Sequence, residues 1–318
     1  MANDNARKFL EAAGWGKAAR EPLTGDASAR KYVRLRKNDR TAILMDASQL
    51  PEIIAPFVRI DAHLRQLDFN APEIFARDEK NSLLLLEDFG DTTFAQLLDS
   101  QSEPEKLFAL ATDVLIALHR HPQAIPKNLR VYSPDAMLED IGLFLDWRTP
   151  GISETGRAEF RKSWREVLPV AHTVPASLLL RDYHAANLML LPTRDGIRQA
   201  GLLDFQDAYQ GPVTYDLVSL LEDARRDVPE DLRKQMTARY LAQFPSLDRE
   251  AFETSMAILA ALRHTRVLAI FEKLSRHEGK HDYRTLHSPR VERLLQSALR
   301  HPMLAGVKLW FDQYARQN

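Results

Sequence analysis

Three polar residues near the middle of the chain lie at the ends of short apolar runs. One apolar run ends at Asp182, a second begins after Asn187, and a third ends at Asp204. Hairpin-like strands would bring these polar ends to one rim, and so gather two carboxylates and an amide at the edge of a buried sheet. Carboxylate and amide oxygens are the hard ligands that Mg²⁺ prefers. The sequence therefore predicts that Asn187 and Asp204 hold magnesium.

Asp182 stands outside this ligand pair and suits a different role. Transfer of a phosphoryl group needs alignment and neutralised phosphate charge more than covalent help from the protein. We therefore expect Asp182 to act as the catalytic base, or at least to orient the hydroxyl that receives the phosphoryl group. The alternative is that all three residues are ordinary turn formers, since Asp and Asn often end strands without any chemistry.

The elements that must position these residues divide into a β-rich part and a helical part. The first part has strand-like runs and one helix with apolar residues at helical spacing. The later part has segments of helical pattern, one with a capping-box sequence beginning at Ser102 and one with Pro134 at its first position. The predicted strands are 31–36, 41–45, 74–76 and 83–86, and the predicted helices are 51–67, 104–119, 133 onward, 156–172, 214–226, 230–243 and 248–277.

This pattern predicts an α+β chain with two lobes. We expect a small N-terminal nucleotide-binding lobe at 1–88 and a larger, mainly helical catalytic and substrate-binding lobe at 89–318, with a hinge near 87–90. Ligands commonly bind in clefts between domains, which would place a nucleotide at this hinge.

The residues around Asp182 and Asp204 resemble the catalytic and metal-binding loops of protein-kinase-like folds. The segment from Gly211 to Asp216 is similar to the one that follows in the aminoglycoside phosphotransferase and choline kinase superfamily. Within it, three further stretches resemble bacterial anomeric kinases of N-acetylmuramate and N-acetylglucosamine. These stretches are Gly25-Asp-Ala-Ser-Ala-Arg30, Leu86-Glu-Asp-Phe-Gly-Asp-Thr-Thr93 and Arg266-Val-Leu-Ala-Ile-Phe-Glu-Lys-Leu274.

The resemblance implies an ATP- and Mg²⁺-dependent kinase that phosphorylates the anomeric hydroxyl of an amino sugar during cell-wall recycling. The implied nucleotide contacts are Gly25, Ser28, Arg30, Glu87 and Phe89, with adenine at the hinge. The loop at Gly25 and Ser28 would cap phosphates with backbone N–H groups, or it is an ordinary hairpin turn. In the metal-binding loop the usual glycine after phenylalanine is absent.

Met45 is the main departure from the pattern. Kinase-like folds place a lysine on this strand, where it pairs with nucleotide phosphates. Either another cation substitutes, with Arg30, Lys31 and Arg34 as candidates, or the protein does not catalyse. The helix at 51–67 offers Asp61 as its nearest acid.

The candidates for contact with the acceptor are His184, Asp207 and Arg263. A lone histidine is more often structural, and Asp207 would alternatively cap a turn. Arg181 would orient a phosphate or pair with a neighbouring acid. Asp216 is expected to brace the catalytic loop by accepting backbone hydrogen bonds.

Composition narrows the choice of acceptor and compartment. The segment 263–300 carries nine Lys and Arg against four Asp and Glu, which suits a neutral or anionic acceptor better than a polycation, unless these residues form a solvated face. The net charge of −1 gives no field that favours nucleic acid or an anionic membrane, and the chain has no cysteine. We expect a cytoplasmic monomer that binds a small sugar, no nucleic acid and no membrane.

Two rival functions stay open at this point. One is another small-molecule kinase of the same fold, acting on choline, ethanolamine or an aminoglycoside. The other is a pseudokinase that binds nucleotide without turnover, for which Met45 is the only support.

Overall fold

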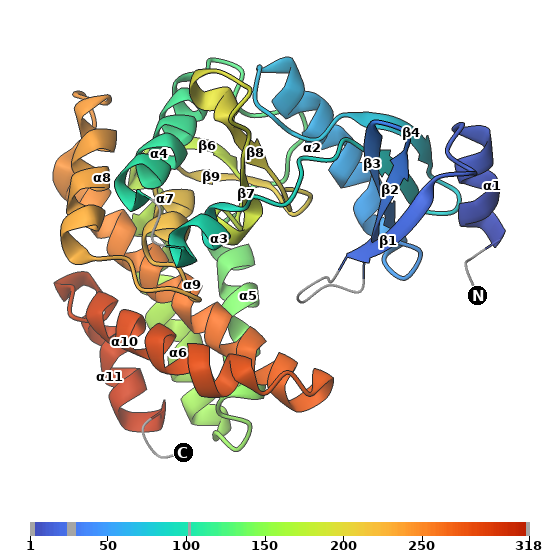
Figure 1. The fold of residues 1–318 in the computed structure, drawn as a ribbon. Helices are drawn as coiled ribbons and strands as arrows, with labels where there is room; N and C mark the ends of the chain where they lie inside the picture. The colour runs from blue at the N-terminus through green and yellow to red at the C-terminus, as the bar shows by residue number, and fades with distance from the viewer. Residues whose placement is uncertain (1–3, 24–29, 101–102, 316–318) are drawn as a thin grey trace. The chain divides into compact units, whose positions relative to one another are not determined.

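The computed structural model describes residues 4–23, 30–100 and 103–315 of the 318-residue chain. They form two compact units (Figure 1). Unit 1 comprises Met1–Glu103 with Ala186–Ala208, and unit 2 comprises Pro104–Ala185 with Tyr209–Asn318. The predicted α+β class is confirmed, since unit 1 carries the large sheet and unit 2 is mainly helical. The two units are defined by which residues pack together, and they do not test the lobe boundary predicted at residue 88. That boundary stays a prediction.

A five-stranded antiparallel sheet forms the centre of the N-terminal part of unit 1 (Figure 1). Its central hairpin turns between Lys37 and Arg40, which face each other in register, and confirms the hairpin expected from the sequence. The strands lie in the order β1-β2-β3-β5-β4. Their bounds are β1 Ala19–Leu23, β2 Lys31–Lys37, β3 Arg40–Asp46, β4 Ile74–Asp78 and β5 Leu83–Leu86.

Three helices accompany this sheet in unit 1. The predicted helix at 51–67 is present as a 3₁₀ turn, Pro51–Ile53, that leads into α2, Ile54–Gln66. Helix α1, Asp4–Ala12, packs Leu10 into a core that contains Leu35 and Leu85 of the sheet. Helix α3, Phe94–Asp99, begins with a capping box in which Thr93 and Gln96 bond each other's backbone N–H groups.

Unit 2 packs its helices around the long helix α9. Helices α5, α7 and α10 contact α9, whose buried aliphatic residues join the main core of the unit. The described helices are α4 Pro104–Arg120, α5 Pro134–Trp147, α6 Glu154–Val167, α7 Thr214–Leu221, α8 Glu230–Ala242, α9 Arg249–Glu278, α10 Ser288–Ala298 and α11 Ala305–Trp310. Two short strands, β6 Ala176–Leu179 and β9 Tyr209–Pro212, pair antiparallel.

The sequence signals for helix ends are largely present in unit 2. Ser133 caps α5 by accepting from the N–H of Ala136, with Pro134 at the first position, as predicted. Gly279 ends α9 with φ of 68°, a left-handed conformation that glycine adopts without strain. The predicted capping box at Ser102 lies outside the described residues.

Helix α9 is long and apolar enough to cross a membrane by length and composition. Its most apolar window, however, is 78% buried inside the protein. Burial of this kind is typical of the central helix of a core.

Helix α7 is shorter than the segment 214–226 that the sequence predicts, because it ends at Leu221. The carboxylate of Asp223 accepts a hydrogen bond of 2.8 Å from the N–H of Arg225. This local bond satisfies a backbone donor outside a helix and so competes with helix continuation.

Arg34 on β2 links the sheet to the segment after β5. Its Nε lies 2.8 Å from the carboxylate of Asp88, and its Nη1 lies 2.6 Å from Asp91. Its Nη2 also donates to the carbonyl oxygen of Gly90 at 2.9 Å. The side chains of Arg34 and Asp88 are each only 4% exposed, so this is a buried ion pair.

We predict that Arg34→Met destabilises unit 1 by about 3–5 kcal/mol, because it leaves the Asp88 carboxylate buried without its cation. Arg36→Met is the matched control on the same strand. Arg36 pairs with Glu21 at 3.2 Å, but both side chains are about half exposed. We expect this control to change stability by less than about 1 kcal/mol. Urea unfolding of the two variants and the wild type measures the difference, and equal losses would contradict the prediction.

Candidate active site

A hairpin in unit 1 brings the two predicted metal ligands to one end of a sheet. Strands β7, Leu188–Leu190, and β8, Ala200–Leu202, pair antiparallel. Asn187 directly precedes β7, and its carbonyl oxygen accepts a hydrogen bond of 3.0 Å from the N–H of Leu203. Asp204 follows one residue later, so two of the three polar residues expected at one rim of a sheet lie together there. The run before Asp182 instead forms β6, which pairs with β9.

Asp204 sits at a strained and crowded turn of the chain. Its φ is 60°, in the left-handed region that aspartate enters only at some cost. Its carboxylate is 29% exposed and accepts hydrogen bonds from Arg30 and from Gln206, the latter at 3.0 Å. Gln206 occupies the place of the missing glycine and also donates to Asp207 at 3.2 Å. The glutamine thus holds the two aspartates of this loop in place.

The oxygens of Asn187 and Asp204 suit Mg²⁺ by their chemistry. Mg²⁺ is commonly bound by one or two carboxylates together with water and substrate phosphates, without an all-protein cage. Among the described residues, no group of three or more His, Cys, Asp or Glu could hold a metal by itself. The donor set therefore fits a magnesium ion that arrives with a nucleotide.

The structure separates the three candidate substitutes for the missing strand lysine. Met45 is fully buried, and Lys31 is exposed at the start of β2. Arg34 is bound to carboxylates, as described above. Arg30 has a side chain 10% exposed and contacts Asp204, so it is the candidate whose charge lies at the metal-binding loop.

Among the residues that the structure describes, Asp61 on α2 makes no ion pair with a lysine. It is 3% exposed, and its Oδ1 has no hydrogen-bond partner among the described residues. Burial raises the pKa of Asp61 to about 7, with Glu87 and Glu73 adding to the effect and Arg65 opposing it. Asp61 is therefore partly protonated at neutral pH, and it does not need the positive partner that a strand lysine would supply.

The side chains of Glu87 and Phe89 are engaged within unit 1. Glu87 accepts from Arg194 and from the N–H of Glu73. The ring of Phe89 packs so closely on Gly201 that a Cβ there would lie 2.8 Å from it. Gly25 and Ser28 lie outside the described residues.

Asp216 of unit 2 fixes the turn of the chain just before Asp182. It is fully buried in the first turn of α7 and accepts from the N–H of Leu180 at 2.6 Å and from that of Arg181 at 2.9 Å. Arg181 has a φ of 68°, so the chain turns sharply just before Asp182. Burial raises the pKa of Asp216 to about 7, and the two backbone donors, which favour the ionised form, oppose a further rise.

The surroundings of Asp182 keep its carboxylate ionised. Desolvation alone would raise its pKa, but the charge of Arg266, together with those of Arg263 and Arg181, brings the pKa below the usual value. A carboxylate with a low pKa is a weak proton acceptor. Asp182 is therefore better suited to orient a hydroxyl group than to remove its proton early.

Arg181 braces the loop by pairing with an acid, which was one of its two predicted roles. Its guanidinium contacts Asp140 and lies 4.8 Å from the ring centre of Tyr132. The hydroxyl of Tyr132 donates to the same carboxylate at 2.7 Å, and Nε of Arg266 lies 3.4 Å from it. Sequence reasoning missed Asp140, because it lies 41 residues from Arg181 and no local spacing links the two.

Two of the predicted acceptor contacts carry buried polar atoms without partners. Nδ1 of His184 and Nη1 of Arg263 make no hydrogen bond to any described residue, although both side chains are at least nine-tenths buried. Buried groups of this kind call for an explanation, and a ligand is one. Burial, with help from Arg225, lowers the pKa of His184, so its ring is uncharged at neutral pH. Asp207, the third candidate, is exposed in unit 1.

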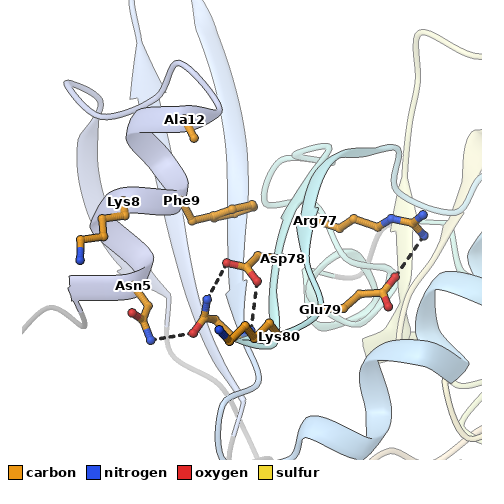
Figure 2. Close-up of a pocket in the computed structure, with 9 residues that line it drawn as sticks. Asn5, Lys8, Phe9, Ala12, Arg77, Asp78, Glu79 and Lys80 are labelled. Atoms are coloured by element: carbon orange, nitrogen blue, oxygen red, sulfur yellow. Dashed lines mark hydrogen bonds and ion pairs between the residues drawn. The ribbon is translucent and has the colours of Figure 1, made fainter.

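One hollow in the described structure is lined by none of these residues. It has a volume of about 610 Å³ and lies between α1 and the turn joining β4 and β5 (Figure 2). Figure 2 shows Asn5 of α1 on one side and Asp78 on the other. Asn5 donates to the side-chain oxygen of Asn81 at 2.7 Å, and the side-chain nitrogen of Asn81 donates to Asp78 at 2.7 Å. These bonds tie α1 to the sheet edge.

Comparison with known protein families matches residues 19–253 to the one described as "Phosphotransferase enzyme family". The match covers well over half of the chain and includes Asp182, Asn187 and Asp204. The chain belongs to this family. The small-molecule kinase class expected from the sequence is thereby confirmed.

Curated relatives of this phosphotransferase share one name. A protein of Caulobacter vibrioides named N-acetylmuramate/N-acetylglucosamine kinase is 33% identical over 96% of this chain and 94% of its own length. A protein of the same name from Pseudomonas aeruginosa is 33% identical over 94% of this chain and 90% of its own.

Solved structures confirm the two-lobed, protein-kinase-like fold. A choline/ethanolamine kinase family protein from Mesorhizobium loti matches with a TM-score of 0.66 over 97% of this chain and all of its own, at 17% identity. A GDP and kanamycin complex of an aminoglycoside phosphotransferase, APH(2")-IIIa, matches with a TM-score of 0.65 over 94% of this chain and all of its own, at 15% identity.

We predict that Asp216→Asn in this phosphotransferase lowers stability by about 1–3 kcal/mol, because the amide nitrogen cannot accept and leaves one buried N–H unpaired. Turnover should fall as well, since the turn before Asp182 loses its brace. Thermal unfolding and steady-state kinetics measure the two effects.

Ser219→Ala is the matched control on the same helix. Ser219 is fully buried, and its hydroxyl has no hydrogen-bond partner among the described residues. Removal of that hydroxyl should therefore leave both stability and turnover close to wild type. An Asp216→Asn variant as stable and as active as the Ser219→Ala variant would contradict the role given to Asp216.

Proposed function

We propose that this phosphotransferase transfers the γ-phosphoryl group of ATP to the anomeric hydroxyl of N-acetylmuramate and N-acetylglucosamine. The observation that carries the proposal is the shared name of the curated relatives, which are 30–33% identical over 85–96% of the chain. We further propose that the protein acts as a monomer in the cytoplasm, in the recycling of cell-wall sugars.

The roles of the site residues follow from their surroundings. Asp182 is ionised and would accept a hydrogen bond from the acceptor hydroxyl, aligning its oxygen with the phosphorus atom. The proton would move to Asp182 as the new bond to phosphorus forms. Asn187 and Asp204 would hold Mg²⁺, which when bound neutralises charge on the phosphates.

The charges near Asp182 favour a sugar over the acceptors of other kinases of this fold. Choline, ethanolamine and aminoglycosides are cations, whereas Asp182 is surrounded by Arg181, Arg263 and Arg266. A cationic acceptor would be repelled by these guanidinium groups. Nδ1 of His184 and Nη1 of Arg263 would instead bond oxygen atoms of a neutral or acidic sugar.

The proposal is tested by ³¹P NMR of the protein with Mg²⁺-ATP and N-acetylmuramate, with N-acetylglucosamine, choline and kanamycin run in parallel. We expect a new sugar-1-phosphate signal, coupled to the anomeric proton, with the two sugars only. Asp182→Asn should slow its formation by about 10²–10⁴-fold while ATP still binds. Asp146→Asn, which alters an exposed aspartate of the same unit, is the matched control. No product with any acceptor, in protein that binds ATP, would favour the pseudokinase alternative.

Arg30 is proposed to supply the phosphate-binding charge that Met45 does not. On this view Arg30→Ala raises the KM for ATP by about tenfold or more, since a charge-assisted contact is lost. If Arg30 only covers Asp204, the same change lowers the Mg²⁺ concentration needed for half-maximal activity and leaves the KM for ATP unchanged. Titrations of ATP and Mg²⁺ separate the two roles, with Arg36→Ala as a control on the same sheet.

A further inference from the structure

A second cavity, of about 230 Å³, lies in unit 2 where the end of α7 meets α8 and α10. This volume is below the roughly 300–1,000 Å³ of pockets that enclose a whole small molecule. It would therefore hold one arm of a ligand. Its walls are Leu221, Glu222, Asp223, Arg226, Asp227, Val228, Arg233, Arg290, Arg293, Leu294 and Ser297.

Positive charge exceeds negative charge among the side chains that line this arginine cavity. Four arginines face three carboxylates in the described structure. Arg226 and Arg290 are largely buried, with side chains 17% and 19% exposed. An arginine does not lose its proton in a protein, so a buried guanidinium group needs an anion.

Three carboxylates meet the four arginines of the cavity, and Asp223, only 2% exposed, lies 3.6 Å from Nε of Arg226. Asp227 lies 3.0 Å from Arg290 and 3.5 Å from Arg293, but it is 70% exposed and shared between them. Glu222 is 3.9 Å from Arg233, whereas its other oxygen lies 2.6 Å from Nε2 of His264. One further negative charge would balance the set, and arginine pairs readily with a carboxylate through two parallel hydrogen bonds.

The wall of the arginine cavity is connected to the surroundings of Asp182. Asp223 lines the cavity and also acts on the pKa of His184, as Asp182 does. Nη1 of Arg225, two residues further along the chain, lies 3.4 Å from Nε2 of His184, and the backbone N–H of Arg225 donates to Asp223. The cavity thus adjoins the residues where the acceptor is proposed to bind.

We propose that the arginine cavity binds the carboxylate of an acidic acceptor, namely the lactyl ether arm of N-acetylmuramate. This inference rests on the proposed function and adds a specificity site to it. N-acetylglucosamine is the neutral sugar without that arm, so the two sugars differ in the group that the cavity would recognise. The cavity therefore distinguishes between acceptors without taking part in phosphoryl transfer.

The test compares the KM values of both sugars in Arg290→Gln and Arg233→Gln variants. Each change should raise the KM for N-acetylmuramate by about tenfold or more, because a charge-assisted bond to the carboxylate is lost. The KM for N-acetylglucosamine and both kcat values should stay within about twofold of wild type. Arg239→Gln is the matched control, since Arg239 lies on α8 like Arg233 but pairs with Asp113 outside the cavity.

A second variant should change the KM for N-acetylmuramate in the opposite direction, which a purely structural defect would not do. Asp227→Asn removes an exposed competitor for Arg290 and Arg293. It should lower the KM for N-acetylmuramate and leave that for N-acetylglucosamine unchanged. A structural defect would not improve the binding of one sugar alone.

The remaining outcomes would overturn the inference in distinguishable ways. Equal changes of KM for both sugars in Arg290→Gln would show that the arginines only support the fold. Inorganic phosphate that inhibits both sugars equally in the wild type, but not in Arg290→Gln, would assign the cavity to a separate anion. If the wild type phosphorylated neither sugar, the proposed function would fail and the inference with it.

Discussion

The carboxylate of Asp216 is the constraint on which the loop that carries Asp182 in unit 2 depends. Its two oxygens accept hydrogen bonds from the backbone N–H groups of Leu180 and Arg181. These residues lie where the chain leaves β6, and Arg181 has a left-handed backbone conformation. A non-glycine residue keeps such a conformation only when its surroundings impose it. Asp216 lies in the first turn of α7, and α7 packs against α9. The position of Asp182 is therefore fixed relative to the core of the unit.

The same loop shows how charge decides what Asp182 can do. The arginines near it favour the ionised carboxylate strongly enough to overcome desolvation. A carboxylate with a lowered pKa has little affinity for a proton, so any contribution of Asp182 to the reaction would come from its geometry. That agrees with a reaction in which the attacking hydroxyl needs alignment and its proton leaves late. The pairing of Arg181 with Asp140 serves this geometry, since it fixes the residue next to Asp182.

The sequence predicts what depends on local pattern and misses what depends on distant pairing. The strands on either side of Lys37 and Arg40 and the hairpin between Asn187 and Asp204 follow from alternating apolar runs and turns. The contact of Arg34 with Asp88 spans 54 residues and has no local signature. The basic segment 263–300 is visible as composition, but its spacing does not tell that Arg290 and Arg293 share a cavity with Arg226 and Arg233. The early end of α7 has no local sequence signal, because it depends on one hydrogen bond, which the Asp223 carboxylate accepts from the N–H of Arg225.

The excess of arginine has a physical reason if the acceptor is acidic. ATP and N-acetylmuramate are both anions, so bringing them together is opposed by repulsion that Mg²⁺ on the phosphates offsets only in part. Guanidinium groups that bind the acceptor's carboxylate neutralise the charge on the acceptor, and so reduce the repulsion further. A neutral sugar makes no such demand, and therefore one catalytic loop can serve both acceptors while a separate set of arginines determines how well the acidic one binds. In an aminoglycoside kinase the acceptor is a cation, and the same arginines would work against binding. We therefore expect the sign of the charge beyond the catalytic loop to separate members of this fold that phosphorylate acidic sugars from members that phosphorylate cations.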